Sequence, residues 1–222
     1  MSYGIGWAIG VPALVPVLNT LVSFPLMVAA LRRGDVRLAV ARMLLWALTM
    51  GIAATLLSWA YPAQTEELFL RSGDYRREMF TWVMTGRGAE STPSQFIPQQ
   101  IGHAALFTAL AIASGGALAM PMGAALMNYM GHYVGTLAGV SRHPIAIMVL
   151  GWHPWAVIRV VSFVALGVVL SAPLLARVFR FQIDWPTARR IAIWAATGLV
   201  ADIVLKTLLA PAWQRLLIRT LG

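Results

Sequence analysis

The most informative segment of the chain is residues 101–140, IGHAALFTALAIASGGALAMPMGAALMNYMGHYVGTLAGV. It contains no Asp, Glu, Lys or Arg. The hydrocarbon core of a bilayer is about 30 Å thick, and a helix of about 20 apolar residues crosses it. The segment is therefore long enough for two membrane spans, or for one long helix with an interfacial extension. Pro121 is the natural break between two spans, because proline cannot donate the backbone hydrogen bond of a helix interior.

The composition of the whole chain also favours a membrane location. Hydrophobic residues make up 59% of the 222 residues and charged residues 11%, whereas soluble domains average roughly 45–50% and 25%. This excludes a soluble enzyme or a nucleic-acid-binding domain, although the net charge is +9. The cations are arginines and a single lysine, Lys206, mostly in short clusters between apolar stretches, which is typical of loops that flank membrane spans. Without cysteine there is no disulfide and no thiolate ligand or nucleophile.

We predict an all-α integral membrane protein with six transmembrane helices, and residues 1–222 as a single polytopic domain. Five helices are the alternative, and both topologies place eight arginines inside. The clearest basic cluster, Arg32, Arg33 and Arg37, is expected in the cytoplasm, with the N-terminus outside. The preference for Arg over Lys and the absence of a basic signal-peptide region indicate a bacterial inner membrane. The expected spans are residues 4–31, 38–61, 101–120, 123–140, 156–176 and 191–211.

Residues 62–100 form the long polar segment, and their near-neutral charge predicts an extracytoplasmic loop. Within it we expect two short helices, the second beginning at Asp74 and ending near Gly86. Apolar side chains share one face of the second helix, which predicts that it lies on the membrane surface. Packing of that face against the protein's own helices is the alternative. The face consists of Tyr75, Met79, Trp82 and Val83.

Glycine recurs at every fourth position from residue 131 to residue 139. Gly131, Gly135 and Gly139 therefore lie on one helix face, where small side chains let two membrane helices approach closely. We expect this face to pack against another helix, either of this chain or of a partner.

Polar side chains within the expected spans are candidates for a proton path. Asn128, Tyr129 and His132 cluster on one segment, where they either complete a hydrogen-bond network or line a hydrated site. Asp202 and Lys206 lie four residues apart in the last span, a spacing that lets their charges meet on one helix face. We expect this pair near the middle of the span, facing protein or water. Its role is either structural or proton exchange.

The histidines are His103, His132, His143 and His153, and they raise the question of a cofactor. A transmembrane b-type haem needs two imidazoles at one depth on facing helices, and no metal-binding motif such as HExxH is present. Interfacial histidines are the favoured interpretation. We predict no cofactor and no metal, with b-type haem as the alternative, and Arg159 is expected to extend toward the membrane boundary.

Three function classes remain open, in this order. The first is a non-catalytic subunit or scaffold of a larger membrane complex, because the chain lacks catalytic motifs and contains the glycine face. The second is a transporter or channel for protons or a small solute. The third is a membrane enzyme or haem carrier. The expected partners are the lipid bilayer and other membrane protein subunits, and no nucleic acid.

Overall fold

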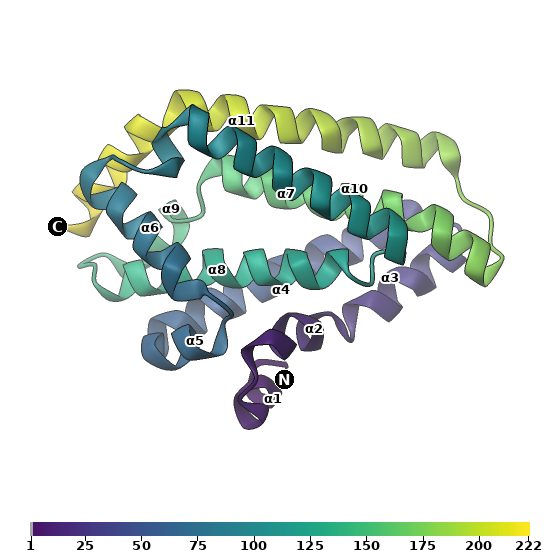
Figure 1. Cartoon of the computed structure of the whole chain (residues 1–222), viewed down its shortest axis with the longest axis horizontal. Coiled ribbons are helices and arrows are strands. Elements are labelled where there is room, and N and C mark those ends of the chain that lie inside the picture. Colours follow the sequence, from purple (N-terminus) through teal and green to yellow (C-terminus); the bar gives the residue numbers. More distant parts are fainter. Residues whose placement is uncertain (1) are drawn as a thin grey trace.

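The computed structural model describes residues 2–222, and within them the chain is helical with no strand. Residue 1 of the predicted domain lies outside the described residues. The long helices lie side by side, and the short helices α5, α6 and α9 lie at one end of the molecule (Figure 1). In chain order the helices are α1 (Ser2–Ile9), η1 (Pro12–Leu14), α2 (Val15–Thr20), α3 (Ser23–Arg32), α4 (Val36–Ala60), α5 (Pro62–Leu68), α6 (Ser72–Thr85), η2 (Ala89–Ser91), α7 (Pro93–Ser114), α8 (Ala119–Gly139), α9 (Pro144–Leu150), α10 (Pro154–Phe179) and α11 (Trp185–Leu221).

Five helical segments are long and apolar enough to cross a membrane, which is consistent with an integral membrane protein. Large apolar side chains on their outer faces are exposed, as expected for surfaces that meet lipid; Trp194 of α11 is 72% exposed. The five segments are Pro12–Arg32, Val36–Ala60, Pro93–Ser114, Pro154–Phe179 and Trp185–Leu221.

The first segment begins later than expected. The predicted span over residues 4–31 is divided at Gly10, whose φ of +69° ends α1. Pro12 then starts a new helical segment, since proline is favoured in a first turn and disfavoured farther inside a helix. Residues 4–9 therefore belong to a separate short helix.

Residues 101–140 form parts of two helices that run in opposite directions, α7 and α8 (Figure 1). The break lies at Gly115 and Gly116, not at Pro121 as predicted. Both glycines have positive φ, +59° and +90°, which residues with a Cβ rarely adopt. A Cβ at Gly116 would also lie 2.5 Å from Oγ of Ser171 in α10. Pro121 falls in the first turn of α8, where the missing N–H has no helical partner to lose.

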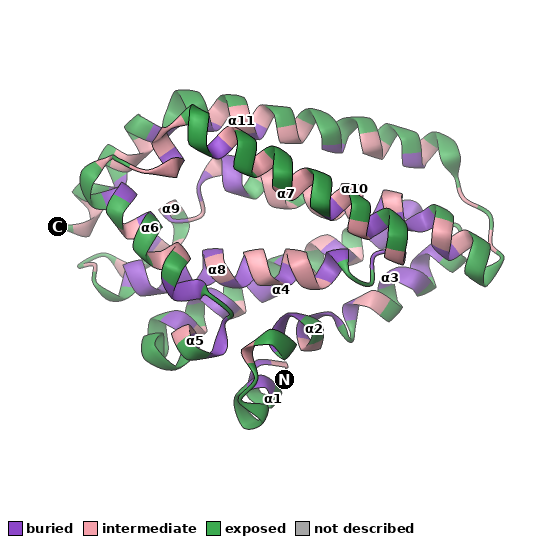
Figure 2. Ribbon diagram, viewed as in Figure 1, coloured by how far each residue is buried: buried purple, intermediate pink, exposed green. Residues whose placement is uncertain are grey.

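Helix α8 is the most interior of the long helices. Fourteen of its residues are buried, and Figure 2 shows it mainly as buried or intermediate, whereas much of α11 is exposed. It is not one of the five segments that are long and apolar enough to cross a membrane. Because α4, α2 and α6 cover it, its polar side chains meet protein.

The polar segment after α4 folds into α5, α6 and η2 at the end of the molecule opposite the α3–α4 and α10–α11 connections (Figure 1). Helix α6 ends at Thr85, with Gly86 in the left-handed conformation, close to the expected end. Its apolar face is buried: Met79, Trp82 and Val83 pack in one cluster with Tyr133 of α8 and Leu217 of α11. This contact corresponds to the alternative of packing against the protein's own helices. Helix α7 already begins at Pro93, inside the predicted 62–100 loop.

Candidate functional site

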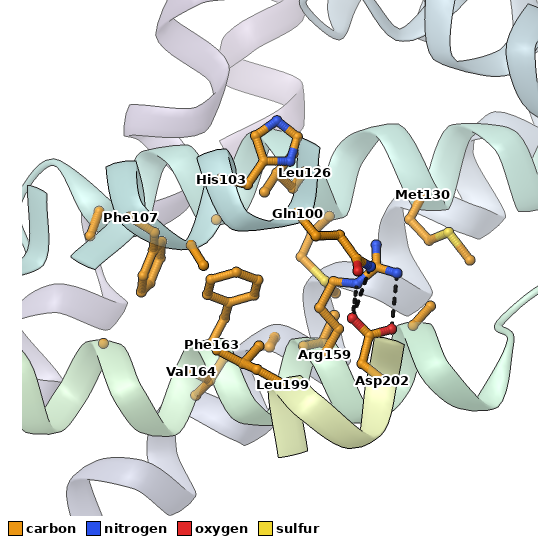
Figure 3. A pocket seen from close by; sticks show the side chains of 18 of the residues that line it. Gln100, His103, Phe107, Leu126, Met130, Arg159, Phe163, Val164, Leu199 and Asp202 are labelled. Atoms are coloured by element: carbon orange, nitrogen blue, oxygen red, sulfur yellow. Dashed lines mark hydrogen bonds and ion pairs between the residues drawn. The ribbon is translucent and has the colours of Figure 1, made fainter. Parts of the chain in front are cut away.

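A cavity of about 590 Å³ lies between α4, α7, α8, α10 and α11. Its wall is polar and charged at the end near α6 and η2, and mainly apolar along the rest. The polar wall includes Tyr75, Glu78, Glu90, Gln100, His103, Tyr129, Arg159, Asp202 and Lys206. Figure 3 shows Arg159, Asp202 and Gln100 facing one another, with Phe107 and Phe163 farther along the cavity.

The first element of the polar wall is a three-residue contact that connects α7, α10 and α11. Arg159 holds Asp202 with two parallel bonds: Nε donates to Oδ2 at 2.8 Å and Nη2 to Oδ1 at 3.0 Å. Gln100 Nε2 also donates to Asp202 Oδ2, at 2.9 Å. Asp202 is 2% exposed. A planar guanidinium matches a carboxylate in this two-bond geometry, which is among the strongest side-chain contacts.

The second element joins α11 to the polar segment before α7. Lys206 Nζ donates to Oε1 of Glu90 at 2.7 Å and lies 4.4 Å from the ring centroid of Phe96, a cation–π contact. Burial alone would raise the pKa of Glu90. The positive charges of Lys206 and Arg159 more than offset this effect, so the pKa is below its ordinary value. The carboxylate therefore remains ionised and neutralises Lys206.

These contacts correct the expected pairing of Asp202 with Lys206. Although the two residues are one helical turn apart, each binds a partner on another element. Along α11, Asp202 lies near the middle, 17 residues after Trp185 and 19 before Leu221. The partners of the two residues come from near the ends of other elements. Arg159 is five residues from the start of α10, about 7.5 Å along the helix axis, and Glu90 belongs to η2.

The polar cluster predicted on α8 does not converge on one site. Asn128 accepts a hydrogen bond from the hydroxyl of Tyr3 at 2.8 Å, away from the cavity. Tyr129 does line the cavity, where its ring stacks on that of Tyr75 with centroids 6.0 Å apart. Of the five residues proposed for a proton path, the cavity wall therefore includes Tyr129, Asp202 and Lys206.

His132 faces α4 and α5 instead. Its Nδ1 lies 3.2 Å from the hydroxyls of Thr65 and Ser58, and Nε2 lies 3.8 Å from Oε2 of Glu66. The ring is fully buried. These contacts hold the polar segment against α8 and place His132 outside the cavity wall.

The glycine face of α8 packs against α4 of the same chain. A Cβ at Gly131 would lie 2.5 Å from the Cβ of Ala54, and one at Gly135 would lie 2.8 Å from that of Ser58. Gly139 is less constrained, since its nearest neighbour would be Trp59 at 3.8 Å. The close contact is thus within the chain.

His103 and His153 have different surroundings. His103 lines the cavity. His153 is buried between Trp82 and Trp155, with centroid distances of 5.2 Å and 4.7 Å, and burial lowers its pKa to about 4. Within residues 2–222 no three His, Asp or Glu side chains come together in a metal-binding arrangement.

Sequence reasoning missed the three partners of Asp202 and Lys206 in the polar wall, which are Arg159, Glu90 and Gln100. Arg159 was expected to reach the membrane boundary, but it turns inward to Asp202. The available signal was a cation and an anion in neighbouring spans, since charges within a membrane are usually paired. Glu90 and Gln100 carry no comparable signal, because both come from a polar segment with several similar side chains.

Comparison with known protein families, with curated proteins and with solved structures finds no match to this chain.

Proposed function

We propose that this chain is an integral membrane protein of six crossing helices that binds a small molecule in the cavity, in the class of transporters and channels. The observation that supports this function is the cavity itself, with two buried ion pairs in its wall. Ligand sites typically combine an apolar cavity of 300–1,000 Å³ with a few convergent polar groups. Charged side chains inside a membrane usually face such a cavity or one another.

A six-helix topology is supported by the position of the basic clusters. Arg32 lies 5.6 Å from the ring centroid of Phe179, so the α3–α4 and α10–α11 connections share one end of the molecule. A five-span topology would place these two connections on opposite sides of the membrane. In our proposal α8 is the sixth crossing helix, the shared basic end is cytoplasmic, and the N-terminus and residues 62–92 are outside. The membrane is the inner membrane of a bacterium, and the ends of α5 and α6 lie at its outer surface.

A subunit of a larger complex is the second candidate. The glycine face no longer supports it, since α4 occupies that face. The sparse burial of α7 and α11 does favour it: 17% of the most apolar window of each is buried, against 33% for α4 and α10. A partner helix would contact these two surfaces.

The topology is tested by cysteine labelling of the full chain in sealed membrane vesicles. The chain has no cysteine, so Thr85→Cys and Gln182→Cys, both at exposed positions, each supply one reactive thiol. Six spans predict labelling from opposite sides by a membrane-impermeant maleimide. Labelling of both from the same side would support five spans.

The function is tested by native mass spectrometry of the full chain, extracted in nanodiscs from the membrane in which it is expressed. A small molecule bound at one copy per chain supports the proposal. A stoichiometric protein partner with an empty cavity supports the subunit class instead. Soret absorption of the same sample would favour the haem carrier.

A further inference from the structure

The cavity has a polar end and an apolar end that are far apart along α10. Arg159 lines the polar end, and Ser171 lines the other. Twelve residues separate them, which is about 18 Å along the helix axis. One leaflet of a bilayer core of about 30 Å is of similar depth. The length of the cavity along α10 is thus similar to the thickness of one leaflet of the bilayer core.

The wall beyond Arg159 offers no charge to a ligand. It is formed by apolar side chains, including Phe107, Phe163, Val164 and Val168. The hydroxyl of Ser171 donates to the backbone oxygen of Gly167 at 2.6 Å, so it has no proton left to donate to a ligand. This part of the cavity fits a hydrocarbon chain and disfavours a polar solute.

The polar end is balanced in charge. Arg159 with Asp202, and Lys206 with Glu90, sum to zero, and the cavity wall also includes Arg71 and the acids Asp74 and Glu78. The seven groups together carry three positive and four negative formal charges. An anionic head would therefore gain no net attraction.

A hydrogen-bond donor and an acceptor remain at this end. Arg159 uses Nε and Nη2 on Asp202, and among the described residues Nη1 has no partner. Gln100 Oε1 is buried and without a partner within residues 2–222. A ligand group that both accepts and donates, such as a hydroxyl or an amide, would satisfy both atoms.

On the side of α7 and α8, the cavity wall includes a residue that is exposed on the outer surface of α7. The two helices meet at the 115–118 turn, where Phe107 packs over Gly123, and they diverge toward the other end (Figure 1). Ile101, which lines the cavity, is 58% exposed. An apolar tail can pass here from the bilayer without crossing water.

We propose that the cavity binds an amphiphile with an uncharged hydrogen-bonding head and a single apolar tail, and that this ligand enters from the bilayer between α7 and α8. The inference rests on the proposed function, since it requires that the cavity binds a small molecule. The head contacts Arg159 and Gln100, and the tail lies along Phe163 and Val168.

The experiment measures binding of fluorescent monopalmitoylglycerol to the full chain in nanodiscs. Gly123→Leu fills the cavity, and its Cβ fits because the nearest atom, on the Phe107 ring, is 3.7 Å away. Gly102→Leu is the matched control, since a Cβ there meets nothing within 4 Å. We expect binding about tenfold weaker for Gly123→Leu and unchanged for Gly102→Leu.

A second pair of variants guards against misfolding of the first. Val164→Phe narrows the apolar part of the cavity. Val161 is on the same helix but does not line the cavity and is 43% exposed, so Val161→Phe is the control. Weaker binding for Val164→Phe alone supports the proposal, and equal binding by both variants overturns it. Each protein is first compared by thermal unfolding.

Competing ligands separate the head from the tail. Monooctanoylglycerol, palmitic acid and glycerol should each compete more weakly than monopalmitoylglycerol. If palmitic acid competes as well as monopalmitoylglycerol, the proposed preference for an uncharged head is overturned. If glycerol competes as well, the proposed binding site for the tail is overturned. A water-soluble molecule found in the cavity by native mass spectrometry would overturn this inference and uphold the proposed function. An empty cavity that binds no ligand in either assay would overturn both.

Discussion

Removing one charge from the cavity wall should destabilise the protein by an amount that depends on the partner left behind. Asp202→Asn leaves Arg159 unpaired, and Lys206→Met leaves Glu90 unpaired. Breaking a buried pair costs about 3–5 kcal/mol. The Arg159 side chain is 27% exposed and that of Glu90 11%. We therefore expect about 3 kcal/mol for Asp202→Asn and about 5 kcal/mol for Lys206→Met.

Matched double variants test the pairing directly. Asp202→Asn with Arg159→Gln removes both charges of one pair, and Lys206→Met with Glu90→Gln removes both charges of the other. Each double variant should recover most of the lost stability, because no isolated charge remains. The mismatched double, Asp202→Asn with Lys206→Met, should be less stable than either single variant, because it leaves two charges unpaired.

Thermal unfolding of the full chain in a mild detergent measures these differences. For a protein of this length a loss of 1 kcal/mol lowers Tm by about 2–4 °C. The expected decreases are about 6–12 °C for Asp202→Asn and about 10–20 °C for Lys206→Met. A mismatched double with the Tm of the unmodified protein would refute the reasoning, since it would mean that Asp202 and Lys206 neutralise each other.

Two further predictions concern the helix contact and the pH dependence. Gly135→Ala should lower Tm, because its Cβ would lie 2.8 Å from Cβ of Ser58, whereas Gly139→Ala should leave Tm almost unchanged; equal Tm values for both would contradict the close contact. The pKa of Glu90 is below its ordinary value of 4.5 in the folded protein, so its pairing with Lys206 stabilises the fold above about pH 4.5 and is lost as the pH falls through the folded pKa. Scanning calorimetry at decreasing pH should show a steeper loss of Tm for the unmodified protein than for Glu90→Gln with Lys206→Met, and parallel curves would contradict this.

The all-helical membrane character could be predicted because it depends on the composition of whole segments. Single residues also predicted some helix ends, such as Gly86, whose left-handed conformation terminates α6. The break at Gly115 and Gly116 could not be predicted, although glycine permits it, because the close approach of Ser171, which leaves no room for a Cβ at Gly116, comes from a helix far along the chain. A local rule therefore favoured Pro121, which the structure accommodates in a first turn.

The candidate site was predictable only in part, for a similar reason. Asp202 and Lys206 could be recognised, since charges in an apolar segment are rare. Their partners are 43 and 116 residues away in the sequence. Because Asp202 and Lys206 are four residues apart on one helix, the sequence favoured a pairing of these two residues over pairing with Arg159 and Glu90. Only the packing of α10 and η2 beside α11 decides between these partners.

The interior position of α8 has a consequence for biosynthesis. The hydrogen-bond partners of Asn128 and His132 are Tyr3, Asn19, Ser58 and Thr65, all of which precede α8 in the chain. The ribosome makes them first, so they have entered the membrane before α8 emerges. Helix α8 therefore does not need to partition into lipid with bare polar groups, because a protein surface that receives them is already in place. In the proposed six-helix topology, the order of synthesis thus lets a helix with a polar middle insert as a late component of a partly assembled bundle.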